Sequence, residues 1–416
     1  MRATPAAAGA IVAGIALAAG SCSGQKLPFG ASISNLVTGQ RTPAPSPTAR
    51  PTPVPSPTPR PGPLPRAPGA LPAPVLAGST SVTVSTFAGD GTAAYRDGIG
   101  TAAQFAGPLG ITVLASGTIY VADSTFDPAT ESAAVFGRIR RIGRDTAEAS
   151  TIAGDGTAGG ADGIGTEARF RYPFGVASDG EGAIFVMDSN NHALRKVFRS
   201  GLVYTPALSS TTGGAIEPFN LPHGVALGPA GILYVADTVN RQIRKVSPDG
   251  AVSLLTGTGF SGVVDGPPAS ASFMSPIALT VDGVGNVYVA DDQASNIRKV
   301  TPAGIVTTLA GAPGGGFADG PGTVARFSKP HGVAIDAAGN VYVADYGNHR
   351  IRLVAPDGRV STLAGVTDGA GRGGHVDGVG NRAKFNGPIA LALDPGGLLY
   401  VSDYGNHRIR KISPAP

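Results

Sequence analysis

The strongest constraint on the fold is a short motif that the sequence repeats six times. Each copy has an aromatic residue, Val, a small residue or Met, and Asp, and a basic run of the type Ile-Arg-Lys follows. The six aspartates are Asp123, Asp188, Asp237, Asp291, Asp345 and Asp403, at intervals of 65, 49, 54, 54 and 58 residues. Six units of about fifty residues indicate a repeat architecture.

One unit, residues 330–365, shows what each repeat forms. The runs PHGVAID, VYVAD, RIRLVA and RVSTLAG are separated by the turn sequences AAGN, YGNH and PDG. Short β-branched runs bounded by turn residues predict four antiparallel strands, here called a to d. Six such units predict an all-β fold, a six-bladed β-propeller of four-stranded antiparallel blades. The longest interval predicts an enlarged b–c loop in the first blade, within STFDPATESAAVFG.

The two ends of the repeat region predict how the ring closes. The chain finishes after strand c of the sixth copy, at NHRIRKISP, whereas the region begins with SVTVSTFAG, which matches RVSTLAG of strand d. We therefore expect residues 81–89 to complete the last blade and to remove two exposed sheet edges.

Alternation along strand b predicts that each motif aspartate pairs with an arginine of strand c. In the fifth copy Val343 and Asp345 share one face of strand b, opposite Arg350 and Arg352. The expected partners in the six blades are Arg140, Arg195, Arg244, Arg298, Arg352 and Arg410. An active site needs one constellation, whereas every blade needs its turn, so we interpret the repeated YGNHR turn as structural, with Gly347 at positive φ.

A second recurrent segment precedes five of the blades. Its copies are RDGIGTAAQF, ADGIGTEARF, VDGPPASASF, ADGPGTVARF and VDGVGNRAKF, and no copy occurs between residues 201 and 222. Asp-Gly is typical of a tight turn, and the closing Phe is spaced to fill the gap between blades. Calcium binding by Asp155, Asp162 and Glu167 is the alternative.

These repeats resemble the NHL-repeat family, whose Asn-His-Leu pattern is seen loosely at Asn191, His192 and Leu194. The resemblance covers residues 81–416 and recurs six times. It implies a six-bladed propeller. It does not imply one function, because members of the family include enzymes, RNA-binding proteins and extracellular sensor domains.

The six histidines are all expected on the face formed by the b–c turns and d–a loops. His192, His349 and His407 fall in b–c turns and His375 in a d–a loop. His223 and His331 begin strand a in LPHGVAL and KPHGVAI, nearest the central channel.

The placement of His223 and His331 resembles that of propeller lyases with histidines at the channel mouth, namely the peptide-amidating and streptogramin B lyases. That resemblance implies a zinc site at His223 and His331, with His375 as a possible third ligand. The equivalent positions in the other blades hold Leu109, Phe174, Ile277 and Ile389, which do not bind metal, so the alternative is a wet channel lined by polar residues. A gluconolactonase-type site is disfavoured because all five glutamates fall in expected loops.

The N-terminal region has a different composition. Residues 1–22 have a basic start, an apolar run and the sequence AGSC, which is typical of an export signal and resembles a bacterial lipobox with Cys22 as the lipidated residue. Residues 23–80 contain a Pro-rich tract without hydrophobic periodicity, which predicts a disordered, extended stalk before the propeller of residues 81–416.

Charge argues against nucleic acid as a partner. Six of the 32 basic residues and none of the 28 acidic ones lie before residue 90, so the propeller carries 26 basic and 28 acidic residues. A domain of that charge lacks the basic surface that phosphate binding requires.

These observations favour a monomeric, exported protein, tethered to the cell envelope through Cys22 or else periplasmic or secreted. We expect it to be a non-catalytic module that binds or senses an unidentified protein, peptide or small molecule, without a cofactor. The binding residues are expected on blades 5 and 6 and at the channel mouth: Tyr346, His349, Arg350, Tyr404, His407, Arg408, His223 and His331. The alternative is an extracytoplasmic metal-dependent lyase or hydrolase with its site at the channel mouth.

Overall fold

The computed structural model describes residues 70–79, 81–125, 137–211, 217–366 and 373–416. The chain divides into a unit of residues 1–58 and a unit of residues 59–416, of which only the second contains described residues. The predicted export signal, lipid attachment at Cys22 and the stalk up to residue 69 lie outside the described residues. The same holds for residues 126–136 of the enlarged loop.

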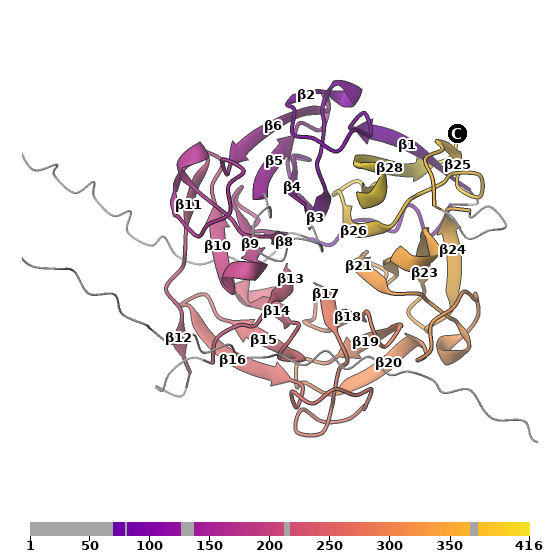
Figure 1. Cartoon of the computed structure of the whole chain (residues 1–416). Coiled ribbons are helices and arrows are strands. Elements are labelled where there is room, and N and C mark those ends of the chain that lie inside the picture. Colours follow the sequence, from indigo (N-terminus) through magenta and orange to yellow (C-terminus); the bar gives the residue numbers. More distant parts are fainter. Residues whose placement is uncertain (1–69, 80, 126–136, 212–216, 367–372) are drawn as a thin grey trace, which may run out of the picture. The chain divides into compact units, whose positions relative to one another are not determined.

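Six antiparallel sheets surround a central axis, as Figure 1 shows, and the prediction of a six-bladed β-propeller is confirmed. In each blade, strand a lies innermost and strand d lies towards the outside. We call the face with the b–c turns and d–a loops the upper face, and the face with the a–b and c–d turns the lower face.

The strands of the first three blades follow in chain order. Blade 1 consists of β3 (Pro108–Val113), β4 (Ile119–Ser124), β5 (Gly137–Ile142) and β6 (Glu148–Ala153). Blade 2 consists of β8 (Pro173–Ser178), β9 (Ile184–Asp188), β10 (Ala193–Val197) and β11 (Leu202–Tyr204). Blade 3 consists of β13 (Pro222–Leu227), β14 (Leu233–Asp237), β15 (Gln242–Val246) and β16 (Ala251–Thr256).

The last three blades complete the ring. Blade 4 consists of β17 (Pro276–Val281), β18 (Val287–Asp291), β19 (Asn296–Val300) and β20 (Val306–Gly311). Blade 5 consists of β21 (Pro330–Ile335), β22 (Val341–Asp345), β23 (Arg350–Val354) and β24 (Val360–Ala364). Blade 6 consists of β26 (Pro388–Leu393), β27 (Leu399–Asp403), β28 (Arg408–Pro414) and β1 (Val82–Ala88).

Ring closure occurs through β1, as predicted. β1 pairs antiparallel with β28, with Val84 opposite Ile412, so the first described strand is strand d of the last blade. A bulge between Thr86 and Ala88 interrupts the ladder near its end.

Four blades have a fifth short strand that the sequence did not predict. The additional strands are β2 (Gly98–Ile99), β7 (Gly163–Ile164), β12 (Ser209–Ser210) and β25 (Gly378–Val379). Three of them come from the Asp-Gly segment and pair with strand d, whereas β12 runs parallel to β16. Blades 4 and 5 have Pro267 and Pro321 after Asp-Gly, and only a single bridge to strand d forms there, between Gly266 and Val306 and between Gly320 and Val360.

Besides the strands, the described part of the chain has helices of the 3-10 type only, and all are short. They are η1 (Gly100–Ala102), η2 (Gly165–Glu167), η3 (Ser189–Asn191), η4 (Pro229–Gly231), η5 (Gly322–Val324), η6 (Tyr346–Asn348) and η7 (Tyr404–Asn406). Among these described residues, no helix has the length and apolar character needed to cross a bilayer.

The core lies between neighbouring blades. One cluster contains Tyr342 and Ile351 of blade 5 together with Val401 of blade 6. Phe385, which ends an Asp-Gly segment, is fully buried in the same cluster, so the prediction that this Phe fills the gap between blades is confirmed. Burying a side chain of this size contributes about 1.5–3 kcal/mol.

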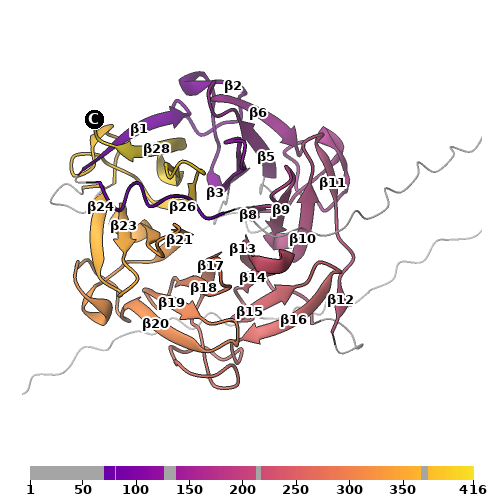
Figure 2. The same ribbon diagram turned by 180° about the vertical axis from the view of Figure 1, so that it is seen from behind.

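Residues 70–79, which we call the strap, cross the lower face of the ring, although their composition placed them in the stalk. Figure 2 shows this indigo segment running across the central strands. Leu76 is buried in the core cluster between blades 5 and 6, and the carbonyl of Pro72 accepts a hydrogen bond from the Ala337 amide at 2.8 Å. The packed part of the chain therefore begins before residue 81.

Deleting residues 81–89 should lower the melting temperature and promote self-association. The deletion removes β1 and leaves β28 with an unpaired edge, and exposed strand edges pair with other chains. Differential scanning fluorimetry and light scattering measure the two effects. Deletion of residues 41–49, nine residues of the Pro-rich tract, is the control and should have neither effect. Equal behaviour of the two deletions would contradict closure through β1.

Candidate functional site

The motif aspartate forms an ion pair with the strand-c arginine in all six blades, as predicted. The shortest N–O separations are 2.9 Å for Arg140–Asp123, 2.7 Å for Arg195–Asp188, 3.4 Å for Arg244–Asp237, 3.8 Å for Arg298–Asp291, 2.7 Å for Arg352–Asp345 and 2.7 Å for Arg410–Asp403. The six aspartates are fully buried, and so are the arginines apart from slight exposure of Arg195 and Arg244.

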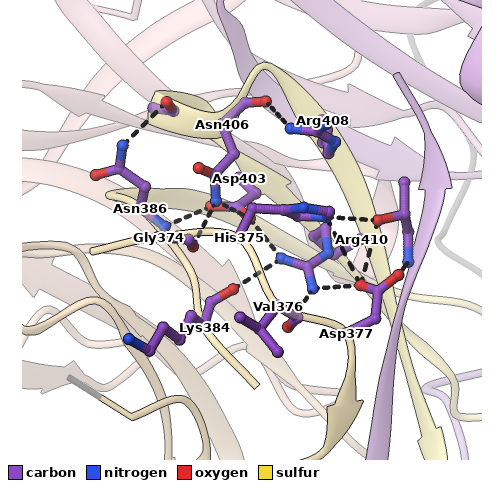
Figure 3. Close-up of polar contacts among 12 residues, drawn as sticks. Gly374, His375, Val376, Asp377, Lys384, Asn386, Asp403, Asn406, Arg408 and Arg410 are labelled. Carbon is purple, nitrogen blue, oxygen red and sulfur yellow. Dashed lines mark hydrogen bonds and ion pairs between the residues drawn. The ribbon is translucent and has the colours of Figure 1, made fainter. Parts of the chain in front are cut away.

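Each pair makes further hydrogen bonds, as Figure 3 shows for blade 6, and only Nε of each arginine is buried without a partner among the described residues. Asp403 accepts the backbone N–H of Asn386 and the side-chain amide of Asn406, both at 2.8 Å. Arg410 donates to the carbonyls of Lys384 and Val376 at 2.9 and 3.0 Å. The Asn of the repeated turn therefore completes the buried network, which supports its structural interpretation.

The aspartate of each Asp-Gly segment forms a second ion pair with the strand-c arginine of its blade. The sequence reasoning missed this role. The five aspartates are Asp97, Asp162, Asp265, Asp319 and Asp377. The phenylalanine that ends the segment packs against the same guanidinium, at 5.1 Å for Arg410 and Phe385. The two recurrent motifs are thus halves of one structural unit.

Blade 3, which lacks the Asp-Gly segment, has a weaker version of this unit. Glu217 takes the place of the second carboxylate at 3.6 Å from Arg244, and its side chain is 64% exposed. Phe219 lies under the guanidinium at 5.7 Å.

Burial affects the motif aspartates as expected for carboxylates removed from water. It raises the pKa of Asp123 and that of Asp188 to about 6, while the arginine and the backbone N–H groups lower it. At pH 7 the ionised form still dominates, so the pair remains charged.

The histidines of the b–c turns have structural roles. His192, His349 and His407 have φ of 54–55°, whereas Gly347, predicted to adopt positive φ, does not. A side chain at Gly347 would instead meet Ser328, with a Cβ 2.8 Å from its carbonyl oxygen. Nδ1 of His349 accepts the amide of Gly387 in the next blade at 2.9 Å. These rings link neighbouring blades.

The arginines that follow these histidines also have protein partners. Arg350 lies over the ring of Phe317, 3.8 Å from its centroid. Arg408 donates to the carbonyl of Asn406 at 3.0 Å and to that of Asp90. Of the residues predicted on blades 5 and 6, Tyr346 and Tyr404 belong to the site described below, and ligand binding by His349, Arg350, His407 and Arg408 stays a prediction.

The possible metal ligands are not brought together. His375 contacts Thr86 of β1 at 2.8 Å, in the outer part of blade 6, whereas His223 and His331 begin inner strands of blades 3 and 5. Among the described residues no three His, Cys, Asp or Glu side chains group as metal ligands. The three carboxylates of the alternative calcium prediction each accept a hydrogen bond from a protein group. Asp155 accepts one from Arg169, Asp162 one from Arg195, and Glu167 one from the Ile164 amide.

Two positions of each repeat surround the axis on the upper face. One precedes Gly or Ala in strand a and is occupied by Leu109, Phe174, His223, Ile277, His331 and Ile389. The other follows the motif aspartate and is occupied by Ser124, Ser189, Thr238, Asp292, Tyr346 and Tyr404. Both positions vary between repeats, whereas the motif aspartate does not.

Apolar side chains close the channel at this level. Leu109, Phe174, Ile277 and Ile389 are buried in one core cluster, with exposures of 8% or less. At this position of strand a only His223 and His331 are polar, so four of the six residues do not supply the predicted polar lining. Gly332 allows the inner strands to approach closely, because a Cβ there would lie 2.6 Å from Cα of Ala390.

Aromatic and titratable side chains gather above this closure. The group, which we call the upper centre, consists of Tyr172, Phe174, His223, Asp292, Lys329, His331, Tyr346 and Tyr404. His331 stacks on Tyr346 with ring centroids 4.6 Å apart, and His223 meets Phe174 edge-on at the same separation.

The three tyrosines lie close enough to affect one another. Burial raises the pKa of Tyr172, and the neighbouring phenols of Tyr404 and Tyr346 raise it further. All three side chains are partly exposed. The upper centre thus presents aromatic surface with phenol groups to solvent.

The titratable groups of the upper centre have shifted pKa values. Burial lowers the pKa of His223 to about 4 and that of His331 to about 3. The neighbouring His223 and Lys329 also lower the pKa of His331. Burial also raises the pKa of Asp292 to about 6. Near pH 7 both imidazoles are neutral, and the charges of Asp292 and Lys329 offset each other.

Two polar atoms below the tyrosines have no hydrogen-bond partner within the described residues. They are Nδ1 of His331 and Oδ1 of Asp292, both buried. Asp292 Oδ1 lies 3.7 Å from His331 Nε2, beyond hydrogen-bond distance. They are two of sixteen such buried side-chain atoms in the described residues, and what distinguishes them is their place beside the aromatic rings of the upper centre, where water or a ligand can pair with them. By contrast, Nδ1 of His223 contacts the Thr238 hydroxyl at 3.0 Å.

The NHL repeat model matches residues 219–246, 327–352 and 385–412, which include strands a to c of blades 3, 5 and 6. The chain contains NHL repeats within a six-bladed β-propeller. The resemblance that the Asn-His turns suggested is thereby confirmed.

Two curated relatives contain a similar region. Protein SUPPRESSOR OF QUENCHING 1, chloroplastic, from Arabidopsis thaliana is 29% identical over 294 residues, covering 63% of this chain. NHL repeat-containing protein 2 from Bos taurus is 35% identical over 159 residues, covering 35% of this chain. The matched regions span 27% and 22% of these two relatives, so this NHL-repeat chain corresponds to about a quarter of either protein.

A solved structure has the same fold. It is an auxiliary nutrient binding protein from Bacteroides thetaiotaomicron VPI-5482, with a TM-score of 0.60 and 18% identity. The match covers 80% of this NHL-repeat chain and 76% of that protein. At this identity the likeness concerns the fold alone.

Sequence reasoning missed four members of the upper centre as site residues, namely Tyr172, Phe174, Asp292 and Lys329. Asp292 occupies the position of Tyr346 in blade 4, and aligning the residue after each motif aspartate reveals it. Tyr172 has an unusual positive φ of 59°, which the sequence does not signal.

Replacing His331 with Gln should reduce the acid sensitivity of the protein. The folded-state pKa of His331 lies below its unfolded value, so between about pH 6.5 and 3 the unfolded chain binds the additional proton and stability falls with decreasing pH. Asp292, with a raised pKa, has the opposite effect and is retained in the variant. The slope of the unfolding free energy against pH should decrease by up to about 1.4 kcal/mol per pH unit.

Urea denaturation between pH 4 and 8 measures these slopes. Above pH 7 the difference between wild type and His331→Gln should be independent of pH, which provides the internal control. Parallel curves over the whole range would contradict a buried, neutral His331.

Proposed function

We propose that this NHL-repeat propeller is a non-catalytic binding module whose ligand site is the upper centre. The carrying observation is that unpaired polar atoms of His331 and Asp292 lie beside the partly exposed Tyr346, which stacks on His331 and neighbours Tyr172 and Tyr404. Preformed sites commonly combine an aromatic surface with a few polar groups that orient the ligand.

The chemistry of the upper centre favours an uncharged ligand with a flat apolar face and hydroxyl groups. Tyrosine rings provide the apolar contact, and the carboxylate of Asp292 requires a donor. The neutral imidazoles and the offsetting charges of Asp292 and Lys329 give no preference for an ion. Oligosaccharides have this combination of properties, and nutrient binding by a propeller of the same fold is consistent with it.

The proposed module is exported and tethered to the cell envelope through Cys22. The support is the sequence of residues 1–22, with its apolar run followed by AGSC. A Pro-rich tract between Cys22 and the propeller serves as a spacer that holds the binding domain away from a membrane.

A metal-dependent lyase or hydrolase at the channel mouth is the weaker alternative. It requires a third ligand beside His223 and His331, and His375 bonds to Thr86 in the outer part of blade 6 instead. Metal analysis of protein purified without chelator distinguishes the two: about one equivalent of zinc favours the enzyme.

The binding proposal predicts that neutral oligosaccharides raise the melting temperature through the upper centre. A panel of neutral and charged oligosaccharides is screened by differential scanning fluorimetry, and isothermal titration calorimetry measures the dissociation constants of those that bind. Tyr346→Ala and Tyr404→Ala should each weaken binding at least tenfold, because each removes an aromatic contact surface.

Tyr204→Ala is the matched control, since Tyr204 is another partly buried, stacked tyrosine but belongs to the outer strand β11. Its variant should bind as wild type does. Failure of every neutral sugar to bind, or equal affinity in the Tyr346 and Tyr204 variants, would contradict the proposal.

A further inference from the structure

A recess at the lower end of the channel lies on the face opposite the upper centre. Its volume is about 290 Å³, and its walls come from strand a of all six blades. The apolar walls include Val113, Val176, Val225, Leu279, Val333 and Leu391. Thr112, Ser178 and Thr280 add hydroxyl groups.

The strap lies along this recess and inserts two leucines into the propeller. Leu71 and Pro72 form part of the recess wall, and Leu71 packs against the central core cluster. Leu76, five residues further, is 1% exposed and fills a position between blades 5 and 6. The strap thus has two apolar anchors, separated by a segment with exposed residues at 73–75.

Backbone contacts fix the strap between these anchors. The Pro72 carbonyl accepts from the Ala337 amide in the a–b turn of blade 5. The Ala73 carbonyl lies against Gly397 in the equivalent turn of blade 6, where a Cβ would come within 2.6 Å of it. Pro72 and Pro74 have no N–H, so the recess holds this segment through its carbonyl groups and side chains.

The part of the strap that crosses the recess, residues 71–74, is free of turns, and residues 75–78 then turn to insert Leu76. Within the described residues, strand a of each blade pairs only with strand b, so its channel-facing edge has no partner strand. Extended, proline-containing segments lose little conformational entropy on binding because they are already ordered in a single backbone conformation.

We propose that the lower recess, together with the position that Leu76 fills between blades 5 and 6, is a peptide-binding site for a segment with a Leu-Pro pair and a following turn that inserts a second apolar residue four positions after the proline. The strap, with Leu71, Pro72 and Leu76, is its occupant in cis. The site is separate from the upper centre and does not depend on the function proposed there.

The test uses the full-length chain with the strap weakened by Leu71→Ser and Leu76→Ser. The probe is a fluorescein-labelled peptide of residues 69–79, GALPAPVLAGS, and fluorescence anisotropy measures its binding. The strap variant should bind the peptide saturably at one site, with a dissociation constant below about 1 mM. Wild type should bind at least tenfold more weakly, because the tethered strap competes at high effective concentration.

A matched pair of glycine variants tests the recess side. Gly397 and Gly285 occupy the same turn position in blades 6 and 4, with φ of +84° and +90°, but a Cβ at Gly285 has no atom closer than 3.5 Å. Both alanine substitutions add the same backbone strain, and only Gly397→Ala obstructs the peptide. Added to the strap variant, Gly397→Ala should weaken the peptide at least tenfold and Gly285→Ala less than threefold.

Near-UV circular dichroism confirms that each protein is folded. If the double leucine variant does not fold, the test is instead hydrogen exchange of the strap amides in the single variants Gly397→Ala and Gly285→Ala. The strap amides should exchange at least tenfold faster in Gly397→Ala than in Gly285→Ala. The proposal is overturned if the peptide binds wild type and strap variant equally, binds neither at 1 mM, or is insensitive to Gly397→Ala. Equal strap exchange in the two glycine variants also overturns it.

Discussion

The buried ion pair between the motif aspartate and the strand-c arginine is the interaction on which the blades depend. In blade 5, Asp345 and Arg352 are both fully buried, and their oxygen and nitrogen lie 2.7 Å apart. Removing two charges from water is costly, so such a pair is stable only when further hydrogen bonds satisfy it. Backbone groups, the turn asparagine and a second aspartate supply these hydrogen bonds to all polar atoms of the pair except Nε of Arg352, and Phe327 packs against the guanidinium. Together they connect strands b and c to the loop before strand a.

This dependence separates the repeated residues from the functional ones. Asp345 is required wherever a blade forms, whereas the next residue faces the axis and differs between blades. The variable position therefore combines Asp292, Tyr346 and Tyr404 in one half of the ring, beside His331 and His223. The scaffold holds these side chains on inner strands that cannot move independently, which is how a symmetric fold acquires an asymmetric site.

Much of the fold could be predicted because its signals are local and repeated. The strands, the ring closure through β1 and the Asp–Arg pairs all follow from alternation and from comparing six copies. The upper centre was less accessible. His349 and Arg408 have the residue types of a binding site, yet their contacts with Gly387 and Asp90 come from neighbouring segments distant in the chain. The strap was missed because two leucines in a Pro-rich tract show no periodicity, although both find apolar partners in the folded ring.

The most direct test compares the unfolding free energies of Asp345→Asn and Asp319→Asn. Both substitutions remove one carboxylate from Arg352, but the side chain of Asp345 is fully buried, whereas that of Asp319 is 46% exposed. Urea denaturation at pH 7 should show a loss of about 3 kcal/mol or more for Asp345→Asn, because it leaves a buried charge without its main partner. For Asp319→Asn the loss should be about 1 kcal/mol or less, since solvent screens the half-exposed carboxylate of Asp319 and Arg352 keeps its buried partner Asp345. Equal losses, or a smaller loss for Asp345→Asn, would contradict the central role of the buried pair.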